Sequence, residues 1–505
     1  MLRYFRDDCG PETTRGSIRV APMHRAASII LLGLSATALL CTSILYSYPL
    51  ILGCAFPSPS AKQPAPFRLL VLADPQLEGD SSLPRADDPL AFTPFGDAVP
   101  RHNKLLHGNS AFVFKLLRKK LDLLGNDYYL AHIYRTLFSL LDPTHVTVLG
   151  DLLGSQWVSD EEFEHRAKRY WNRVLRGGRR LENTIADGLT ITALEDDVRW
   201  KRRIMNIAGN HDIGYGGDID RERMDRFERA FGKANYEVRF TLPSTSAESD
   251  PPELRLIILN SLNLDAPVQD PEIQGTTYNF VNQVISASRP VEDTTTATIL
   301  LTHLPLHKEE GVCVDGPMTN YYENERNGGV KEQNHLSQES SRNILQGIFG
   351  KSGDPGAKNG GVGRNGIILT GHDHEGCDVW HHLPLTTTTE DGEEEKERWW
   401  QARRWNETST QSRAEGGPGI REVTVRSMMG EFGGNAGLLS AWFDEDGTKQ
   451  WRIEYRSCML GKQHWWWAIH VLDLVVLALW AFRGLKRGLR WQREWEENRD
   501  KEKVH

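Results

Sequence analysis

The chain has 505 residues, of which 60 are Lys or Arg and 68 are Asp or Glu, so its formal net charge is −8. This acidic balance argues against a protein dedicated to nucleic acid, because such proteins usually carry a net basic surface. Six cysteines are too few for a small scaffold held by disulfides. A mean hydropathy of −0.48 excludes a polytopic membrane protein, although this average conceals two apolar segments.

The first apolar segment, residues 26–56, contains no charged residue. It is long enough for a transmembrane helix, which needs about 20 apolar residues. Arg19 and Arg25 precede it, so a cleaved signal peptide is the alternative interpretation. We expect a retained transmembrane anchor over 26–56, followed by a linker rich in Pro, Ser and Ala over 57–66.

The second apolar segment, residues 465–482, opens with three consecutive Trp residues. Trp is enriched where a helix meets the membrane–water interface, so the segment is predicted to be a second transmembrane helix. It is short and contains His470 and Asp473, and a buried terminal helix is the alternative.

The charges that flank the two apolar segments predict the orientation of the chain. Residues 1–25 hold five Arg against three acidic residues, and residues 483–505 hold eight Lys or Arg against five. By the positive-inside rule both tails are cytosolic, and the domain between them, residues 67–460, is lumenal or extracellular. Lys501 and Lys503 resemble a dilysine retrieval signal read by the coat-retrieval machinery, which favours the membrane of the endoplasmic reticulum.

Between the apolar segments, short β-rich runs alternate with helical ones, which predicts an α/β fold of stacked mixed sheets flanked by helices. Continuous apolar runs are typical of strands covered on both faces. Strands are predicted at 67–73, 144–149, 203–208, 254–260, 298–301, 366–370 and 422–425, with a closing hairpin formed by 438–443 and 450–455. Helices are predicted at 111–124, 128–141 and 159–176, and a disordered acidic loop at 386–404.

Polar side chains follow five of these predicted strands at the point where each strand ends. They are Asp74 and Gln76, Asp151, Asn210 with His211 and Asp212, His303, and His372 with His374. Any one of them is most often a turn residue. The carboxyl ends of strands in an open α/β sheet converge, however, so we expect the five turns to meet. Carboxylate, amide and imidazole ligands without a cysteine favour a divalent ion such as manganese, iron or zinc.

Read together, the five turns resemble the signature of calcineurin-like metallophosphoesterases. The matching stretches are Asp74-Pro-Gln76, Gly150-Asp151, Gly209-Asn210-His211-Asp212, His303 and Gly371-His372-Asp373-His374. The resemblance implies two divalent metal ions, with manganese the first candidate and iron or zinc the alternatives. It further implies that Asp151 bridges the metals, that Asp74 and His374 hold the first, and that Asn210, His303 and His372 hold the second.

The same resemblance gives His211 the role of a general acid that binds no metal and is oriented by Asp212. One residue departs from the pattern, since Gln76 stands where the family usually has His. An amide oxygen is a weaker donor than an imidazole nitrogen, so either the first metal binds more loosely or Gln76 does not touch it.

A metallophosphoesterase domain between two apolar segments is similar to the ethanolamine-phosphate phosphodiesterases that remodel glycosylphosphatidylinositol (GPI) anchors, the family of yeast cell division control protein 1. Supporting stretches are 210–214, 302–306, 371–377 and 426–434, and the Asp-Pro-Gln sequence is more similar to fungal members. This resemblance implies removal of ethanolamine phosphate from a GPI mannose in the endoplasmic reticulum, which supports maturation and exit of GPI-anchored proteins. Nucleic acid is not an expected partner.

Two alternatives to this function remain open at the level of sequence. One is a lumenal metallophosphoesterase for another phosphoester, such as a nucleotide sugar or a lipid headgroup. The other is a non-catalytic trafficking factor that keeps the fold to bind GPI-anchored cargo, for which the exchange at Gln76 is the one supporting feature.

The cysteines give two further expectations. Cys313 and Cys377 follow two of the converging strand ends, and an oxidising lumen would permit a disulfide between them. The alternative is a pair of buried thiols. Cys41 and Cys54 lie in or beside the first apolar segment and are expected only to pack there.

Overall fold

The computed structural model describes residues 21–60, 63–83, 101–188, 191–194, 198–242, 250–323, 325–384, 399–415 and 417–502. The chain divides into two compact units. One is the domain Tyr48–Trp465, and the other is a helical unit made of Met1–Ser47 and Trp466–His505.

The first sheet of the domain has six strands in the order β16-β15-β1-β2-β5-β3. Strands β1, β2, β5 and β3 run parallel, and the hairpin β15–β16 adds an antiparallel edge. Their bounds are β1 (Phe67–Leu72), β2 (His145–Val148), β3 (Arg179–Arg180), β5 (Arg203–Asn206), β15 (Asn435–Phe443) and β16 (Trp451–Met459). The predicted closing hairpin is therefore confirmed.

The second sheet has eight strands in the order β13-β12-β14-β11-β8-β7-β6-β4. Its central strands β14, β11, β8 and β7 are parallel. The bounds are β4 (Ile191–Ala193), β6 (Tyr236–Thr241), β7 (Glu253–Ile258), β8 (Thr296–Leu301), β11 (Asn365–Thr370), β12 (Cys377–His382), β13 (Gln401–Arg404) and β14 (Gly419–Thr424). A separate ribbon pairs β9 (Thr319–Tyr321) with β10 (Val330–Gln333).

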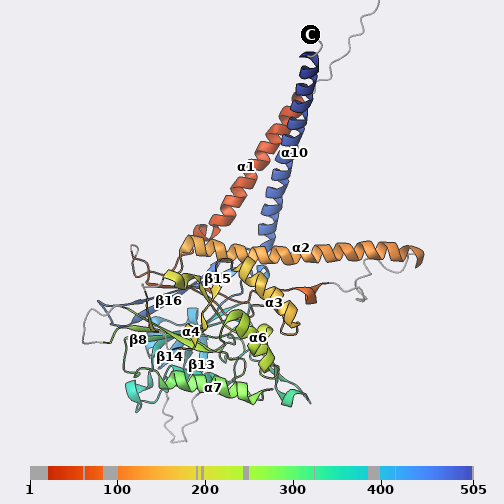
Figure 1. Ribbon diagram of the computed structural model, residues 1–505. Coiled ribbons are helices and arrows are strands. Elements are labelled where there is room, and N and C mark those ends of the chain that lie inside the picture. The colour runs from red at the N-terminus through yellow and green to blue at the C-terminus, as the bar shows by residue number, and fades with distance from the viewer. Residues whose placement is uncertain are drawn as a thin grey trace, which may run out of the picture. The chain divides into compact units, whose positions relative to one another are not determined.

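The main hydrophobic core lies between the two sheets. Leu69 and Val71 of β1, Leu256 of β7 and Leu301 of β8 belong to one cluster and are fully buried. Strand β1 is apolar from Leu69 to its end because its other face is covered as well, as Leu70 and Leu72 are also buried. This arrangement confirms the α/β class with stacked mixed sheets (Figure 1).

Helices cover the outer faces of the sheets (Figure 1). They are α2 (Arg101–Leu141), α3 (Asp160–Arg169), α4 (Asn183–Ala186), α5 (Asn210–Ile213), α6 (Arg221–Phe231), α7 (Pro271–Ser286), α8 (Gln338–Asn343) and α9 (Thr410–Glu415). Tyr170, in the turn after α3, donates to Asn206 of β5 at 2.5 Å, which ties one helical layer to the first sheet. Arg255 of β7 donates to the Val284 carbonyl of α7 at 3.1 Å, and this hydrogen bond connects α7 to the second sheet.

Two sequence predictions differ from the observed elements. The helices expected at 111–124 and 128–141 are one continuous helix, α2. The turn-prone residues between them do not break it because Asp127 is buried and paired with Arg169 at 2.7 Å and Arg173 at 2.6 Å. The acidic loop expected at 386–404 is wrong for its last four residues, which form the edge strand β13. Residues 386–398 of that loop lie outside the described residues.

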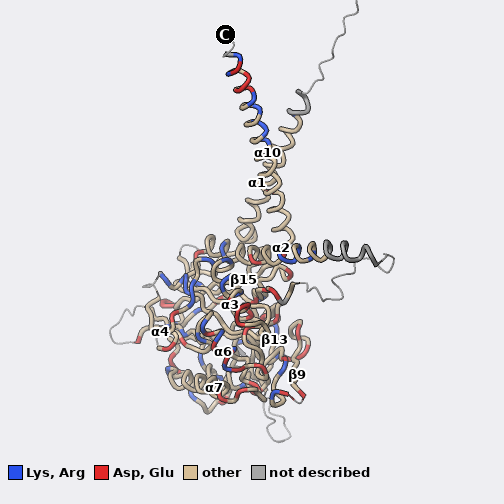
Figure 2. Tube along the Cα trace, turned by 45° about the vertical axis from the view of Figure 1, so that its right-hand side comes forward, with Lys and Arg blue, Asp and Glu red and all other residues tan. Residues whose placement is uncertain are grey.

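The helical unit contains α1 (Ala21–Ile51) and α10 (Gln463–Glu502). Residues 25–51 and 463–501 each contain an 18-residue window, of mean hydropathy 2.1 and 1.8, that is apolar enough to cross a membrane by length and composition. The Thr42 hydroxyl of α1 donates to the Asp473 carboxylate of α10 at 2.8 Å, so this acid within the apolar segment has a polar partner. Figure 2 shows that the Lys and Arg residues of α10 gather in its C-terminal part.

The described residues contain two disulfides. Cys313 and Cys377 are bonded, which confirms the first of the two alternatives for that pair. Cys54 is bonded to Cys458, so the expectation that Cys54 only packs beside the first apolar segment is wrong. The sequence separation of 404 conceals the pairing, since only the fold brings the end of α1 next to β16. Cys41 is free among the described cysteines.

We expect the double variant Cys54→Ser/Cys458→Ser to lower the stability of the domain by about 2–5 kcal/mol, because the disulfide closes a very long loop in the unfolded chain. Thermal unfolding of the purified full chain measures the change. Cys41→Ser is the matched control and is expected to unfold with the intact protein. An unchanged unfolding temperature in the double variant would show that this disulfide does not restrain the domain.

Candidate metal centre

The predicted site residues lie just beyond the carboxyl ends of five strands. Asp74, Asp151 and Asn210 follow β1, β2 and β5 of the first sheet. The three histidines follow strands of the second sheet, His303 after β8 and His372 with His374 after β11. The strands within each set are parallel neighbours in register, so their ends meet at one edge of each sheet.

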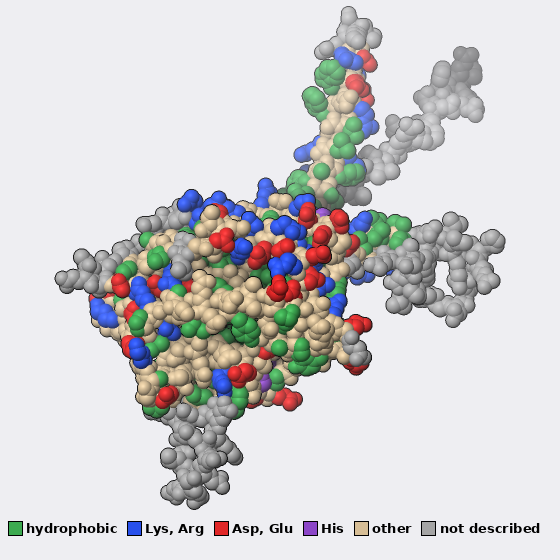
Figure 3. Space-filling model, turned by 60° about the horizontal axis from the view of Figure 1, so that its bottom comes forward, with side chains coloured by type: hydrophobic (Ala, Val, Ile, Leu, Met, Phe, Trp, Pro, Cys, Tyr) green, Lys and Arg blue, Asp and Glu red, His purple; other side chains and the backbone are tan. Residues whose placement is uncertain are grey.

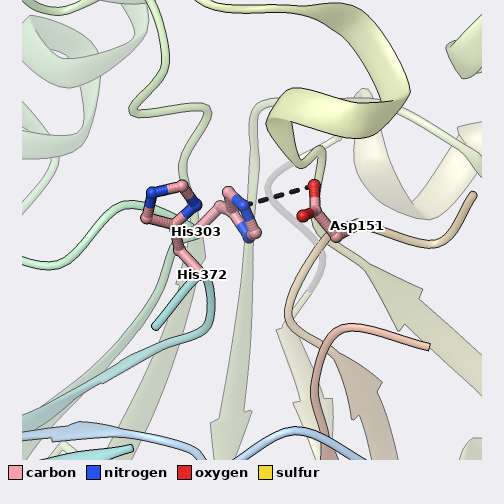
Figure 4. Close-up of side chains that lie close together, drawn as sticks. All are labelled: Asp151, His303 and His372. Atoms are coloured by element: carbon pink, nitrogen blue, oxygen red, sulfur yellow. Dashed lines mark ion pairs between the residues drawn. The ribbon is translucent and has the colours of Figure 1, made fainter. Parts of the chain in front are cut away.

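Two groups of side chains at this edge are spaced to hold a metal ion. One group is Asp151, His303 and His372, and the other is Asp74, Asp151 and His374. Within each group one ligand atom per residue lies within 4.8 Å of the others. Asp151 belongs to both groups, so the geometry provides two adjoining positions that share one carboxylate. Figure 4 shows Asp151 facing His303, with His372 beside that ring.

The first position brings nitrogen and oxygen atoms of three side chains close to Asn210 Oδ1 and to one another. His303 Nδ1 donates to the Leu149 carbonyl at 2.7 Å, which leaves Nε2 of the neutral ring without a proton. That Nε2 lies 3.0 Å from Asn210 Oδ1 and 3.4 Å from Asp151 Oδ1. Asn210 Oδ1 is also 2.9 Å from His372 Nδ1. Nitrogen and oxygen atoms that converge in this way are the donor set of a divalent cation.

The second position contains an unsatisfied buried atom. Asp74 is fully buried, and its Oδ1 accepts from the His372 backbone nitrogen at 3.0 Å. Its Oδ2 has no hydrogen-bond partner in the described part of the chain. A buried carboxylate oxygen without a partner is costly, and a bound cation would satisfy it. The buried carboxylate of Asp74 is therefore suited to bind a metal ion at this position.

Gln76 lies at the second position, and its amide nitrogen faces Asp151 and His374. Its Nε2 donates to Asp151 Oδ2 and to His374 Nε2, each at 3.0 Å. The Gln76 side chain therefore lies where a metal ligand would lie. Its amide group would have to rotate by 180° about its last bond before the oxygen could bind a metal.

The local backbone is unusual at the residues that carry the site. Asp74, Gln76, Asp151 and His372 have φ angles of 50°, 41°, 50° and 75°. Non-glycine residues rarely adopt such angles, which cost about 1–3 kcal/mol each and cluster at functional sites. Gly209 is required for a different reason, because a Cβ there would lie 2.0 Å from the Asp151 backbone nitrogen.

The electrostatics also suit a cation. Burial, with the neighbouring Asp151 charge, raises the pKa of Asp74 well above its usual range. Burial opposes ionisation of Asp151 too, but the surrounding imidazoles outweigh it and lower the pKa of Asp151. Burial and His303 lower the pKa of His372 to about 3. Neutral imidazoles beside carboxylates are the ligand forms that metals bind.

His211 and Asp212 are arranged differently from the predicted pair. The His211 backbone nitrogen donates to Asp151 Oδ1 at 2.9 Å, and its ring Nε2 lies 3.8 Å from Asp151 Oδ2. No hydrogen bond joins Asp212 to the His211 ring among the described residues, and His211 Nδ1 has no partner there. The Asp212 carboxylate instead accepts three backbone N–H groups, from Gly209 at 2.9 Å, Leu152 at 3.1 Å and Leu153 at 3.0 Å. Asp212 therefore fixes the backbone turns that carry His211 and Asp151.

Two residues around the site were not among the predicted site residues. Ser427 donates to the Asp74 carbonyl at 3.1 Å through its hydroxyl and to the His374 carbonyl at 3.1 Å through its backbone nitrogen. The Phe432 ring lies 5.0 Å from the His374 ring, centroid to centroid. These contacts place the stretch 426–434 against Asp74 and His374. The family resemblance had singled out the same stretch.

Comparison with known proteins identifies the family. No protein-family model matches the chain. Over 409 residues it is 35% identical to Protein TED1 of Saccharomyces cerevisiae, covering 72% of this chain and 78% of that protein. It is 25% identical over 319 residues to Metallophosphoesterase 1 of Ailuropoda melanoleuca, covering 59% and 67%. The chain belongs to the Protein TED1 family of calcineurin-like metallophosphoesterases.

A third relative of this metallophosphoesterase is Cell division control protein 1 of S. cerevisiae, 24% identical over 195 residues, or 38% of this chain and 33% of that protein. Membership confirms the resemblance drawn from the five strand ends. The chain is a metal-dependent phosphoesterase, and its buried aspartates and histidines form a site that could bind the metal.

For this metallophosphoesterase, we expect Gln76→His to retain metal about tenfold longer against a chelator, because an imidazole nitrogen is a stronger donor than an amide. Metal content after timed dialysis measures the effect. Gln269→His, at an exposed position, is the matched control. Equal metal loss from Gln76→His and the intact protein would place residue 76 outside the ligand shell.

Proposed function

We propose that this chain is a dimetal phosphodiesterase that removes ethanolamine phosphate from a mannose of the GPI glycan in the lumen of the endoplasmic reticulum. The observation that carries the proposal is the pair of ligand groups that share Asp151, in a chain 35% identical to Protein TED1. In this proposal GPI-anchored proteins are the substrates, and hydrolysis supports their maturation and exit.

In the proposed site Asp151 would be shared by two metals, Asp74 and His374 would complete one position, and Asn210, His303 and His372 would complete the other. Manganese fits this oxygen and nitrogen donor set, with iron and zinc as alternatives. The two ions would supply positive charge to the phosphoryl oxygens and to the attacking water.

His211 is the proposed general acid. Its side chain is 36% exposed and stands beside the bridging carboxylate, so it can reach both the site and an incoming substrate. A sugar alkoxide is a poor leaving group and needs a proton as the ester bond breaks, and an imidazole is well suited to donate one near neutral pH. Asp212 is proposed to position His211 through the backbone turns described above.

The proposed topology places 26–56 and 465–482 in the membrane, 67–460 in the lumen and the tails 1–25 and 483–505 in the cytosol. The two disulfides within the domain support an oxidising compartment, since such bonds are rare in the cytosol. The helix α10 continues to Glu502 and carries Lys501 at its end, while Lys503 lies outside the described residues.

Mass spectrometry of protein-bound GPI glycans tests the proposal directly. Cells with the intact enzyme are compared with cells carrying His211→Ala, and with His165→Ala as a matched control on α3. One additional ethanolamine phosphate in the His211→Ala glycans is expected, and fragmentation names the mannose. Identical glycans, with hydrolysis of other diesters intact, would favour a nucleotide sugar or lipid headgroup as the substrate.

A further inference from the structure

An apolar stripe that is largely exposed among the described residues runs along one face of α2, and only its C-terminal end, at Tyr128, makes a ring contact there, with the Arg173 guanidinium 5.4 Å from the ring centroid. Its members are Val113, Phe114, Leu117, Leu121, Leu124 and Tyr128, each between 39% and 69% exposed. At 100° per residue these six positions fall within an arc of about 100°, which is the apolar face of an amphipathic helix. The stripe extends about 22 Å along the helix axis.

The opposite face of α2 packs on the domain, so the stripe is not a displaced part of the core. Lys119 Nζ donates to the Glu78 carboxylate at 2.8 Å. Further along, Tyr129 and Leu130 are buried. The exposed cations Arg118 and Lys120 lie on the two borders of the stripe. Figure 3 shows hydrophobic and basic side chains together on the described part of the projecting helix.

The place of α2 in the domain indicates what covers the stripe. The Tyr129 hydroxyl donates to the Gly461 carbonyl, two residues before α10 begins. A Cβ on Gly461 would lie 3.7 Å from the ring of Tyr48, near the end of α1. The Cys54–Cys458 disulfide joins the same two chain segments. Both segments that connect the domain to the apolar helices therefore meet beside α2.

We propose that the stripe on α2 lies in the headgroup region of the lipid bilayer that α1 and α10 cross. Amphipathic helices of this kind bury their apolar face at the boundary between headgroups and acyl chains. Arg118 and Lys120, at the borders of the stripe, can extend to the lipid phosphates while their stems stay against the apolar surface. The helix thus forms a third contact with the membrane.

This inference rests on the membrane topology in the proposed function, and photo-crosslinking tests the two separately. The full chain is reconstituted in phosphatidylcholine and phosphatidylinositol nanodiscs with benzoylphenylalanine at one position at a time. Positions Leu117 and Leu121 probe the stripe, Leu40 probes the span α1, and Asp122, exposed on another side of α2, is the matched control. Lipid adducts are expected at Leu40, Leu117 and Leu121 and not at Asp122.

A second variant tests the apolar character of the stripe. With the crosslinker at Phe114, the double change Leu117→Glu/Leu121→Glu should abolish the lipid adduct. Both residues are exposed, so hydrolysis of a soluble diester should stay unchanged and report an intact fold.

Each outcome decides the proposal. Adducts to lipid at Leu40 but to a second copy or another protein at Leu117 would overturn it, as would no adduct at Leu117 or equal adducts at Asp122. If no lipid adduct formed at Leu40 either, the result would contradict the proposed membrane topology as well as the inference about α2. Hydrolysis of the soluble diester, measured on the same samples, reports the metal site independently of both.

Discussion

Asp151→Asn is expected to lose most of its bound metal and at least about a thousandfold in kcat/KM for a soluble phosphodiester, equivalent to about 4 kcal/mol of transition-state stabilisation. The expectation follows from geometry, because Asp151 is the residue common to both ligand groups. The amide keeps the shape of the carboxylate and can still accept from the His211 backbone nitrogen. The amide lacks the negative charge that a ligand shared by two cations needs.

Metal analysis of the purified variant, together with steady-state kinetics over a range of added manganese, measures both effects. Asp225→Asn changes the same functional group at an exposed position of α6 and should keep full metal and activity. If Asp151→Asn retained two metal equivalents and normal turnover, the bridging role would have to pass to another residue.

The sequence was informative about the site because the site is built from strand ends. Each strand is recognised from a short local pattern, and the polar residue that ends it is adjacent in the chain. The convergence of Asp74 and Asp151 then follows from the topology of the parallel neighbours β1 and β2, without knowledge of any side-chain contact. That of His303 depends also on how the second sheet packs on the first. The same argument placed Cys313 and Cys377 near each other, and the structure shows them bonded.

The features that the sequence did not predict depend on contacts between distant segments. Cys54 and Cys458 are 404 residues apart, and no local pattern links them. The contacts of Ser427 with Asp74 and His374 arise because the loop before β15 passes the ends of β1 and β11. The contacts of Asp212 were not predicted for a related reason. Its neighbour in sequence is His211, but its hydrogen bonds go to the backbone around Asp151.

His211→Ala is expected to slow hydrolysis of an alkyl phosphodiester by about 10²–10⁴-fold, the range of general acid catalysis. A 4-nitrophenyl diester should be affected far less, because nitrophenolate leaves without a proton. Metal content should stay at the level of the intact enzyme, since His211 belongs to neither ligand group. Kinetics with the two leaving groups measure the difference, and an equal loss for both would contradict a role in proton transfer.

The comparison with Asp212→Ala separates chemistry from positioning. His211 is partly exposed, and its ring Nδ1 has no hydrogen-bond partner within the described residues, so its removal should change the free energy of unfolding by no more than about 0.5 kcal/mol. Asp212→Ala leaves three backbone N–H groups without an acceptor, and each costs about 1–3 kcal/mol when buried. This variant should therefore unfold at a lower temperature and lose activity equally on both leaving groups. A leaving-group dependence in Asp212→Ala that matches His211→Ala, with normal stability, would instead restore the direct pairing of the two side chains.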